Sequence, residues 1–247
     1  MRKEMRRRSK NEIKSRVIGL CYPPRCPGCD AILLTKDRAL GFCGECRKKI
    51  VVVKERFCMK CGKQLPDSRE EYCEDCGRAE HAFVEGRAVF GYEGVMKAAM
   101  YRFKYGNRRG YAGIFAAWAV RAHGSWIREK QPDVIVPVPL YFRKRQQRGY
   151  NQALVWGAAL GEKLNLAVDG RALFRVRPTR PQKELDPVGR SVNLERAFFA
   201  RREPVAGKTV LLVDDIYTTG STMDEAAETL LEAGAARVFA LSICTGR

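Results

Sequence analysis

No stretch of the sequence approaches the roughly 18 consecutive apolar residues that a membrane-spanning helix needs, so we expect no membrane span. The basic amino terminus, Met1 to Arg16, is followed by an apolar patch that stops at Leu20, too short for a secretory signal. These two absences predict a cytoplasmic protein. Thiols in that compartment stay reduced, so disulfides are not expected among the ten cysteines.

Acidic residues are scarce beside basic ones. The chain has 28 Asp and Glu against 46 Lys and Arg, a formal net charge of +18. An excess of that size favours polyanionic partners such as nucleic acid, anionic lipid or phosphorylated metabolites. A basic surface that merely faces water is the alternative. Hydrophobic residues make up 45% of the chain, enough for a packed core.

The cysteines are spaced as zinc ligands. Two residues between thiolates let both sulfurs converge from one tight turn, and two such turns complete a tetrahedral shell around zinc. A thioredoxin-like redox role is the alternative for one such pair, but four pairs outside a strand–helix context argue against it. The four Cys-x-x-Cys pairs are Cys26/Cys29, Cys43/Cys46, Cys58/Cys61 and Cys73/Cys76.

Sites made of four cysteines are closed, with no position left for a substrate, so we expect two structural zinc ions. Zinc binding would supply the folding energy that a segment of roughly 55 residues cannot find in its own core. Sequential pairing gives two ribbons, 26–46 and 58–76, and an interleaved pairing remains possible. Cys21 and Cys244 are interpreted as small core residues.

From Glu85 onward the pattern becomes that of alternating strands and helices. This alternation predicts an α/β domain with a mainly parallel sheet. The expected organisation is a basic arm (1–20), a zinc-ribbon module (21–80) and an α/β domain (85–247). The basic stretch Arg143 to Arg148 is interpreted as a loop. Strands are expected at 87–92, 133–139, 172–176, 209–213 and 237–243, and helices at 93–105, 111–128, 151–164 and 222–233.

The most informative segment runs from Val210 to Thr222. A buried strand is expected to end in two adjacent carboxylates, Asp214 and Asp215, and ligands of open α/β sheets bind outside such strand ends. A loop of hydroxyls and one glycine then enters a helix, which is a natural phosphate cradle. The alternative is a simple helix cap beside a solvated turn, which needs only one hydroxyl. The loop residues are Thr218, Thr219, Gly220, Ser221 and Thr222.

This segment resembles the 5-phosphoribosyl-1-pyrophosphate (PRPP) signature of type I phosphoribosyltransferases. From about Leu20 to its end, the chain resembles the ComF/ComFC family of competence-associated proteins, which join a zinc-ribbon module to a phosphoribosyltransferase-like domain. The arm before Arg16 lies outside the resemblance, and Gln182 to Leu185 departs from it. Besides the cysteine pairs and the acidic signature, the resemblance rests on Phe103-Lys104-Tyr105, Val136-Pro137-Val138-Pro139, Arg148-Gly149-Tyr150-Asn151-Gln152, Arg190, Asn193 and Phe198.

The resemblance implies roles for particular residues. Thr218 to Thr222 would hold the 5′-phosphate, Asp214 and Asp215 would face the ribose hydroxyls, and Mg²⁺ would bridge pyrophosphate and ribose oxygens. Cationic side chains must also stabilise the departing pyrophosphate. The candidates for that task are Arg143, Arg145, Arg148 and Arg190.

Two hypotheses of function follow. In one, the protein is an enzyme that transfers phosphoribose from PRPP to an acceptor and releases pyrophosphate; nothing in the sequence marks the acceptor. In the other, which the resemblance favours, it binds PRPP and Mg²⁺ and handles single-stranded DNA during DNA uptake, beside a helicase partner. The net charge, the basic arm and exposed aromatic residues suit strand binding.

Overall fold

A computed structural model describes residues 23–66, 69–177 and 197–246 of the chain. Several features singled out above lie outside these ranges. They are the basic arm 1–20, Cys21, the segment Gln182 to Leu185, and Arg190 with Asn193.

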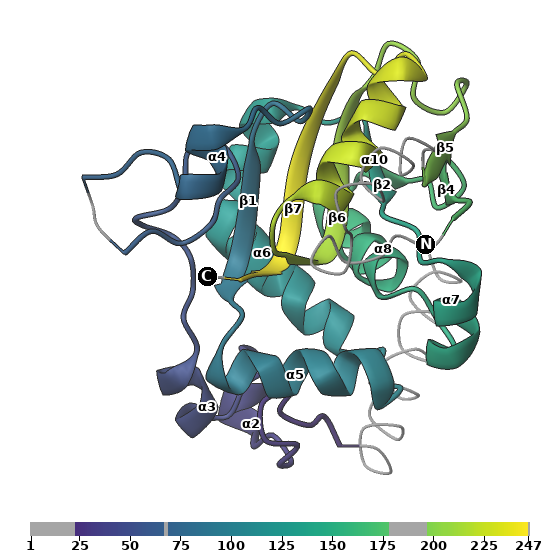
Figure 1. Cartoon of the computed structure of the whole chain (residues 1–247). Helices are drawn as coiled ribbons and strands as arrows, with labels where there is room; N and C mark the ends of the chain where they lie inside the picture. Colours follow the sequence, from purple (N-terminus) through teal and green to yellow (C-terminus); the bar gives the residue numbers. More distant parts are fainter. Residues whose placement is uncertain (1–22, 67–68, 178–196, 247) are drawn as a thin grey trace, which may run out of the picture.

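A parallel sheet of five strands organises the molecule, in the order β1-β7-β6-β2-β3 (Figure 1). Every neighbouring pair in it is parallel, which confirms the predicted α/β class. The central strands are continuous apolar runs, as expected where both faces of a sheet are covered. The strands are β1 (Gly86–Gly91), β2 (Val134–Pro137), β3 (Ala167–Val168), β6 (Thr209–Tyr217) and β7 (Arg237–Thr245).

Helices cover the two faces of this sheet and create two cores. Along β6, Leu211 and Val213 belong to one core, whereas Val210 and Leu212 belong to the other, because successive side chains of a strand point to opposite faces. The first core contains residues of α5 (Gly94–Tyr105), α6 (Tyr111–Lys130) and α8 (Gln152–Leu164). The second contains residues of α10 (Ser221–Glu232) and of the antiparallel pair β4 (Leu173–Arg175) and β5 (Phe198–Ala200).

Strands β3 and β5 were not predicted, and the strand expected at 172–176 pairs with β5 outside the main sheet. Two further differences lie close to the acidic pair. β6 does not end before the aspartates: β7 is equally long and pairs with it up to Tyr217 and Thr245, so the backbone stays extended past the acidic pair. The basic stretch expected to be a loop forms α7 (Phe142–Arg148). No glycine or proline interrupts α7, and it ends where Gly149 adopts a left-handed conformation (φ 75°).

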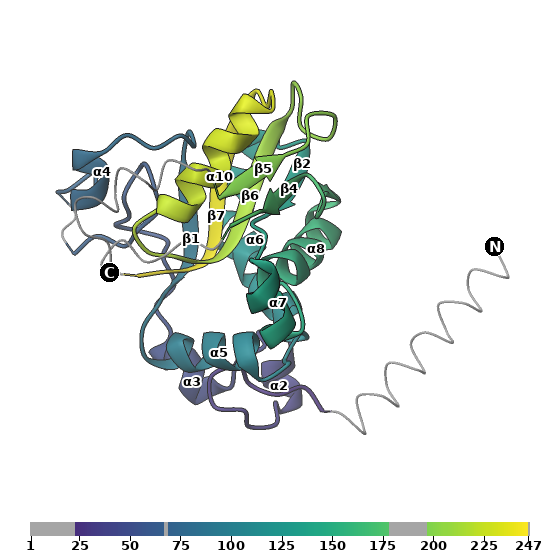
Figure 2. The same ribbon diagram turned by 45° about the vertical axis from the view of Figure 1, so that its right-hand side comes forward.

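The two cysteine-rich halves dock at different places. The first half, with α2 (Thr35–Arg38) and α3 (Gly44–Lys49), lies against α5 (Figure 2). The second, with α4 (Glu74–Arg78), lies beside the start of β1. There a Cβ on Gly62 (φ 75°) would come within 2.5 Å of the Arg87 Cα, so only glycine permits this close approach. Cysteines of the first half belong to the first core, and cysteines of the second half to the second.

Candidate functional site

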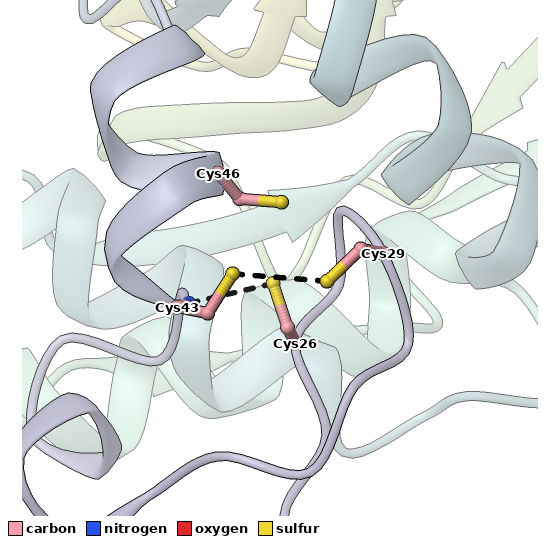
Figure 3. A group of neighbouring side chains, drawn as sticks. All are labelled: Cys26, Cys29, Cys43 and Cys46. Atoms are coloured by element: carbon pink, nitrogen blue, oxygen red, sulfur yellow. Dashed lines mark hydrogen bonds between the residues drawn. The ribbon is translucent and has the colours of Figure 1, made fainter.

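The eight paired cysteines form two tetrads. In each tetrad the four sulfur atoms all lie within 4.8 Å of one another, and Figure 3 shows the first one converging. The grouping is sequential, which settles the question that the spacing left open. The tetrads are Cys26, Cys29, Cys43 and Cys46, and Cys58, Cys61, Cys73 and Cys76.

The geometry of both tetrads fits zinc. A tetrahedral site with Zn–S distances of about 2.3 Å requires sulfurs about 3.8 Å apart. The Cys29 and Cys43 sulfurs are 3.7 Å apart, and so are those of Cys61 and Cys73. In each tetrad the second Cys-x-x-Cys pair begins at a helix start, because Cys43 precedes α3 and Cys73 precedes α4. Each tetrad is therefore suited to one structural zinc ion in a closed site of four thiolates.

The acidic pair lies near the carboxyl end of β6. Asp215 is buried, and its carboxylate forms an ion pair with the ammonium of Lys104 at 3.0 Å. Asp214 is partly buried, and its Oδ1 accepts a hydrogen bond of 2.7 Å from the Asp215 amide. Removal from water and the neighbouring Asp215 carboxylate raise the pKa of Asp214 to about 7. One of the two carboxyl groups is therefore poised to gain or lose a proton near neutral pH.

The predicted phosphate loop follows at the same edge of the sheet. Thr218 and Thr219 are exposed, and Gly220 adopts a left-handed conformation (φ 87°) just before α10 begins at Ser221. The hydroxyls of Thr219 and Ser221 are 3.0 Å apart. The loop thus presents hydroxyls and free backbone N–H groups at the start of a twelve-residue helix, where the helix dipole favours an anion.

Cationic side chains lie close to the acidic pair and to one another. Lys104 at the end of α5 contacts Asp215 directly. Arg175 of β4 is close enough to Asp214 for the two charges to influence each other, although burial lowers the pKa of Arg175. Burial and then repulsion from Arg175 and Arg148 lower the pKa of Lys144 in α7. Three elements, α5, α7 and β4, therefore bring positive charge to the carboxyl edge of the sheet.

The segment Arg148 to Gln152 holds part of this arrangement in place. Arg148 donates hydrogen bonds to the Gln152 side chain (3.2 Å) and the Tyr105 hydroxyl (3.4 Å). The Tyr150 hydroxyl and the Gln152 amide donate to the carbonyls of Phe103 and Lys104. This segment therefore ties the end of α5 to the start of α8 and positions Lys104 beside the aspartates.

The predicted arginines have different surroundings. Arg148 is partly buried within the cationic group, whereas Arg143 and Arg145 are exposed, and Arg190 is outside the described ranges. Sequence reasoning missed Lys104 and Arg175 as site residues. Lys104 stood in a motif noted for the resemblance alone, and no local signal marks Arg175. Cys244 is fully buried, as the sequence interpretation expected.

Within the residues the structure describes, no helix is both long and apolar enough to cross a membrane.

Two family models match the chain. Residues 17–77 match the double zinc ribbon domain, and residues 151–247 match the phosphoribosyl transferase domain. With the tetrads and the parallel sheet, these matches define a protein in which a double zinc ribbon is joined to a phosphoribosyltransferase-type domain.

Named relatives make the assignment more specific. The competence protein ComFC of Bacillus subtilis is 31% identical over a match that covers 62% of this chain and 60% of that protein. Competence protein F of Haemophilus influenzae is 36% identical over a match that covers 42% of this chain and 47% of that protein. The DNA utilization protein YhgH of Escherichia coli is 42% identical over a match that covers 46% of this chain and 49% of that protein. The chain is related to the ComF/ComFC competence proteins, as its sequence indicated, and it spans about half the length of the curated relatives it matches.

Proposed function

We propose that this protein binds PRPP with Mg²⁺ at the carboxyl edge of its sheet and that it acts in DNA uptake. The observation that carries the first part is the arrangement of charges. A pair of carboxylates lies beside a loop of hydroxyls at a helix start. Cations of α5 and β4 act on the pair, and cations of α7 lie close to them. Open α/β sheets bind their ligands outside the carboxyl ends of strands, which is where this arrangement lies.

The loop Thr218 to Thr222 suits the 5′-phosphate. Its hydroxyls and the first free N–H groups of α10 can donate to phosphate oxygens, and the positive end of the helix dipole favours the negative charge. Gly220 allows the loop to turn into the helix with a positive φ that other residues rarely adopt.

The carboxylates suit the ribose and the cation. Asp214 and Asp215 can accept hydrogen bonds from ribose hydroxyls. Mg²⁺ prefers oxygen ligands and keeps several waters, so carboxylates together with PRPP oxygens form a suitable donor set. When bound, Mg²⁺ would neutralise charge on the pyrophosphate. Because the pKa of Asp214 is near 7, a bound cation would also favour its ionised form.

The cationic group suits the pyrophosphate. Lys104, Lys144, Arg148 and Arg175 can offset the negative charge that develops on the leaving group. Arg143, Arg145 and Arg190 remain candidates for the same role. Transfer of phosphoribose to an acceptor, with release of pyrophosphate, is the alternative function and needs the same binding groups.

Calorimetric titration with PRPP and Mg²⁺ tests the proposal. We expect binding by the intact chain and its loss in the Asp214→Asn/Asp215→Asn double variant, which keeps its fold. Asp133→Asn is a matched control, because Asp133 lies at the opposite edge of the sheet, where it accepts from the Thr209 amide. Undiminished affinity in the double variant would refute the site. Pyrophosphate release in the presence of nucleobases or single-stranded DNA would distinguish transfer from binding alone.

Single-stranded DNA handling is the second part of the proposal, and one surface favours it. Tyr101 and Tyr105 on α5 are 66% and 53% exposed, and their rings lie 5.1 Å apart. The Arg148 guanidinium lies over the Tyr105 ring at 5.3 Å. Exposed aromatic rings beside cations are the usual platform for unpaired bases. The names of the relatives, which refer to competence and DNA utilization, support the same role. A helicase partner is part of the proposal only as what the sequence resemblance implies.

A further inference from the structure

The second zinc tetrad lies directly against the proposed phosphate loop. His81, one of only two histidines in the chain, bridges the two. Its Nε2 is 3.2 Å from the sulfur of Cys76, a ligand of the second tetrad. Its Nδ1 forms a short hydrogen bond with Asp224, which lies in the first turn of α10. The Ala82 amide donates to the other oxygen of the same carboxylate at 3.1 Å.

The residues on both sides of the loop also contact this module. Tyr217 ends β6 just before the loop, and it is buried in the second core, which also contains Cys58, Cys61 and Cys73. The Phe83 ring lies between the two sides: it stacks on His81 (5.0 Å) and meets Tyr217 edge-on (6.3 Å). A Cβ on Gly220 would collide with the Tyr217 hydroxyl and lie 3.1 Å from His81 Cε1. The loop is therefore packed closely against the second zinc module.

We propose that the second zinc ribbon is the support of the phosphate loop, and that His81 is the positioning residue that transmits this support from Cys76 to Asp224. The inference rests on the proposed function in so far as the loop binds phosphate. It assigns to the second ribbon a task that the first ribbon does not share.

The contact has a clear physical consequence for an anionic ligand. Asp224 lies four residues after Gly220, and its amide donates to the Gly220 carbonyl at 2.8 Å. His81 and Ala82 hold both oxygens of the carboxylate, so it is directed away from the loop. Without these partners, the carboxylate is free to turn toward the N–H groups of its own helix and to repel an incoming phosphate. The support thus both fixes the loop and withdraws a competing negative charge.

The first ribbon contacts other elements. Arg102 of α5 donates to the carbonyl of Gly28 at 2.7 Å, and the Tyr111 hydroxyl of α6 donates to Asp30 at 3.0 Å. Phe42 packs against Phe90 and Phe115 in the first core. These contacts lie on the face of the sheet opposite α10. They supply a matched control, since Tyr111→Phe removes one hydrogen bond of a zinc module without altering the second ribbon.

The test uses the full chain with its zinc content measured for every variant. In His81→Ala holding two zinc ions, we expect amide hydrogen exchange of residues 218–224 to rise about tenfold and affinity for Mg²⁺ and PRPP to fall about tenfold, the usual scale for a lost charge-assisted hydrogen bond. His81→Asn, whose side-chain N–H can still reach Asp224, should recover part of both. Tyr111→Phe should change neither.

A second variant keeps the test decisive if His81→Ala loses zinc. Asp224→Ala removes the same link from the α10 side and leaves the cysteines untouched, so it should raise loop exchange equally with two zinc ions bound. Unchanged exchange in Asp224→Ala, or an equal effect in Tyr111→Phe, would overturn the inference. If the intact chain binds no PRPP but loop exchange still rises in the variants, the proposed function fails and the supporting role of the second ribbon stands.

Discussion

Asp214→Asn should stabilise the free protein, and more strongly at high pH than at low pH. The folded state holds the Asp214 carboxyl partly buried beside Asp215, which raises its pKa from 3.8 to about 7. Between these two values, the unfolded chain releases the proton while the folded chain keeps it. The stability that the folded state gains by keeping this proton is therefore fully present below about pH 3.8 and is lost as the pH rises through 7. Asparagine has no such proton, and its side-chain oxygen can still accept from the Asp215 amide.

The magnitude follows from the two pKa values. Linkage between pH 5 and pH 8 gives an upper limit of about 2.5 kcal/mol for the loss in stability. Asp214 remains partly open to water and has cations nearby, so we expect about 1 kcal/mol. For a chain of this size, that corresponds to a melting temperature difference of about 2–4 °C.

Thermal melts of the zinc-loaded protein and of the variant, at pH 5 and pH 8 without PRPP or Mg²⁺, measure this effect. The melting temperature of Asp214→Asn minus that of the parent should be about 2–4 °C larger at pH 8 than at pH 5. Asp215→Asn is the comparison: it leaves the Lys104 ammonium without its carboxylate, so it should be less stable than the parent at both pH values. An advantage of Asp214→Asn that is equal at pH 5 and pH 8 would refute the raised pKa.

Three further predictions concern the zinc modules, the basic arm and the exposed tyrosines. Elemental analysis should find two zinc ions per chain, and one or fewer would contradict the double ribbon. Single-strand affinity measured against salt should show a slope smaller by about 2 to 3 after deletion of Met1 to Arg16 if three or four of its cations contact phosphates. Tyr105→Ala should weaken single-strand binding by about 1–3 kcal/mol while leaving the salt slope nearly unchanged. If the parent, the truncated chain and Tyr105→Ala bind single strands equally well, neither the arm nor the exposed tyrosines bind DNA.

The sequence predicted those features that short segments encode. The four Cys-x-x-Cys pairs indicate zinc because both ligands of each pair lie within one short turn. Which two pairs share a zinc site could be decided only from the structure. The acidic pair and its loop lie within one strand–loop–helix unit, so residues 214–222 were identifiable in the same way. The end of β6 was misjudged because its length depends on pairing with β7, a distant segment.

Residues that reach the site through tertiary contacts gave no such signal. Lys104, Arg175 and His81 come from three separate elements, and each is isolated in its own segment. The sequence places Arg143 to Arg148 in a loop after the strand that ends in Pro139, whereas the stretch forms α7. In the structure, Arg143, Lys144 and Arg145 of α7 are all exposed and Arg148 is partly buried, and only Lys144 and Arg148 are linked electrostatically to the cations at the sheet edge.

The balance of charge at the sheet edge also narrows the class of ligand. Lys104 and Arg175 act directly on the two carboxylates, and Lys144 and Arg148 add positive charge close to these two cations, while the pKa of Asp214 is raised to about 7. A site built for a divalent cation alone would show the opposite excess, because bare cations require uncompensated carboxylates. Burial lowers the pKa of Lys144 most, and repulsion from Arg175 and Arg148 lowers it further. A ligand carrying several negative charges relieves that repulsion, and a cation that enters with it can use the carboxylates. The arrangement therefore favours a metal-bound polyanion such as PRPP over either a free metal ion or an uncharged nucleoside.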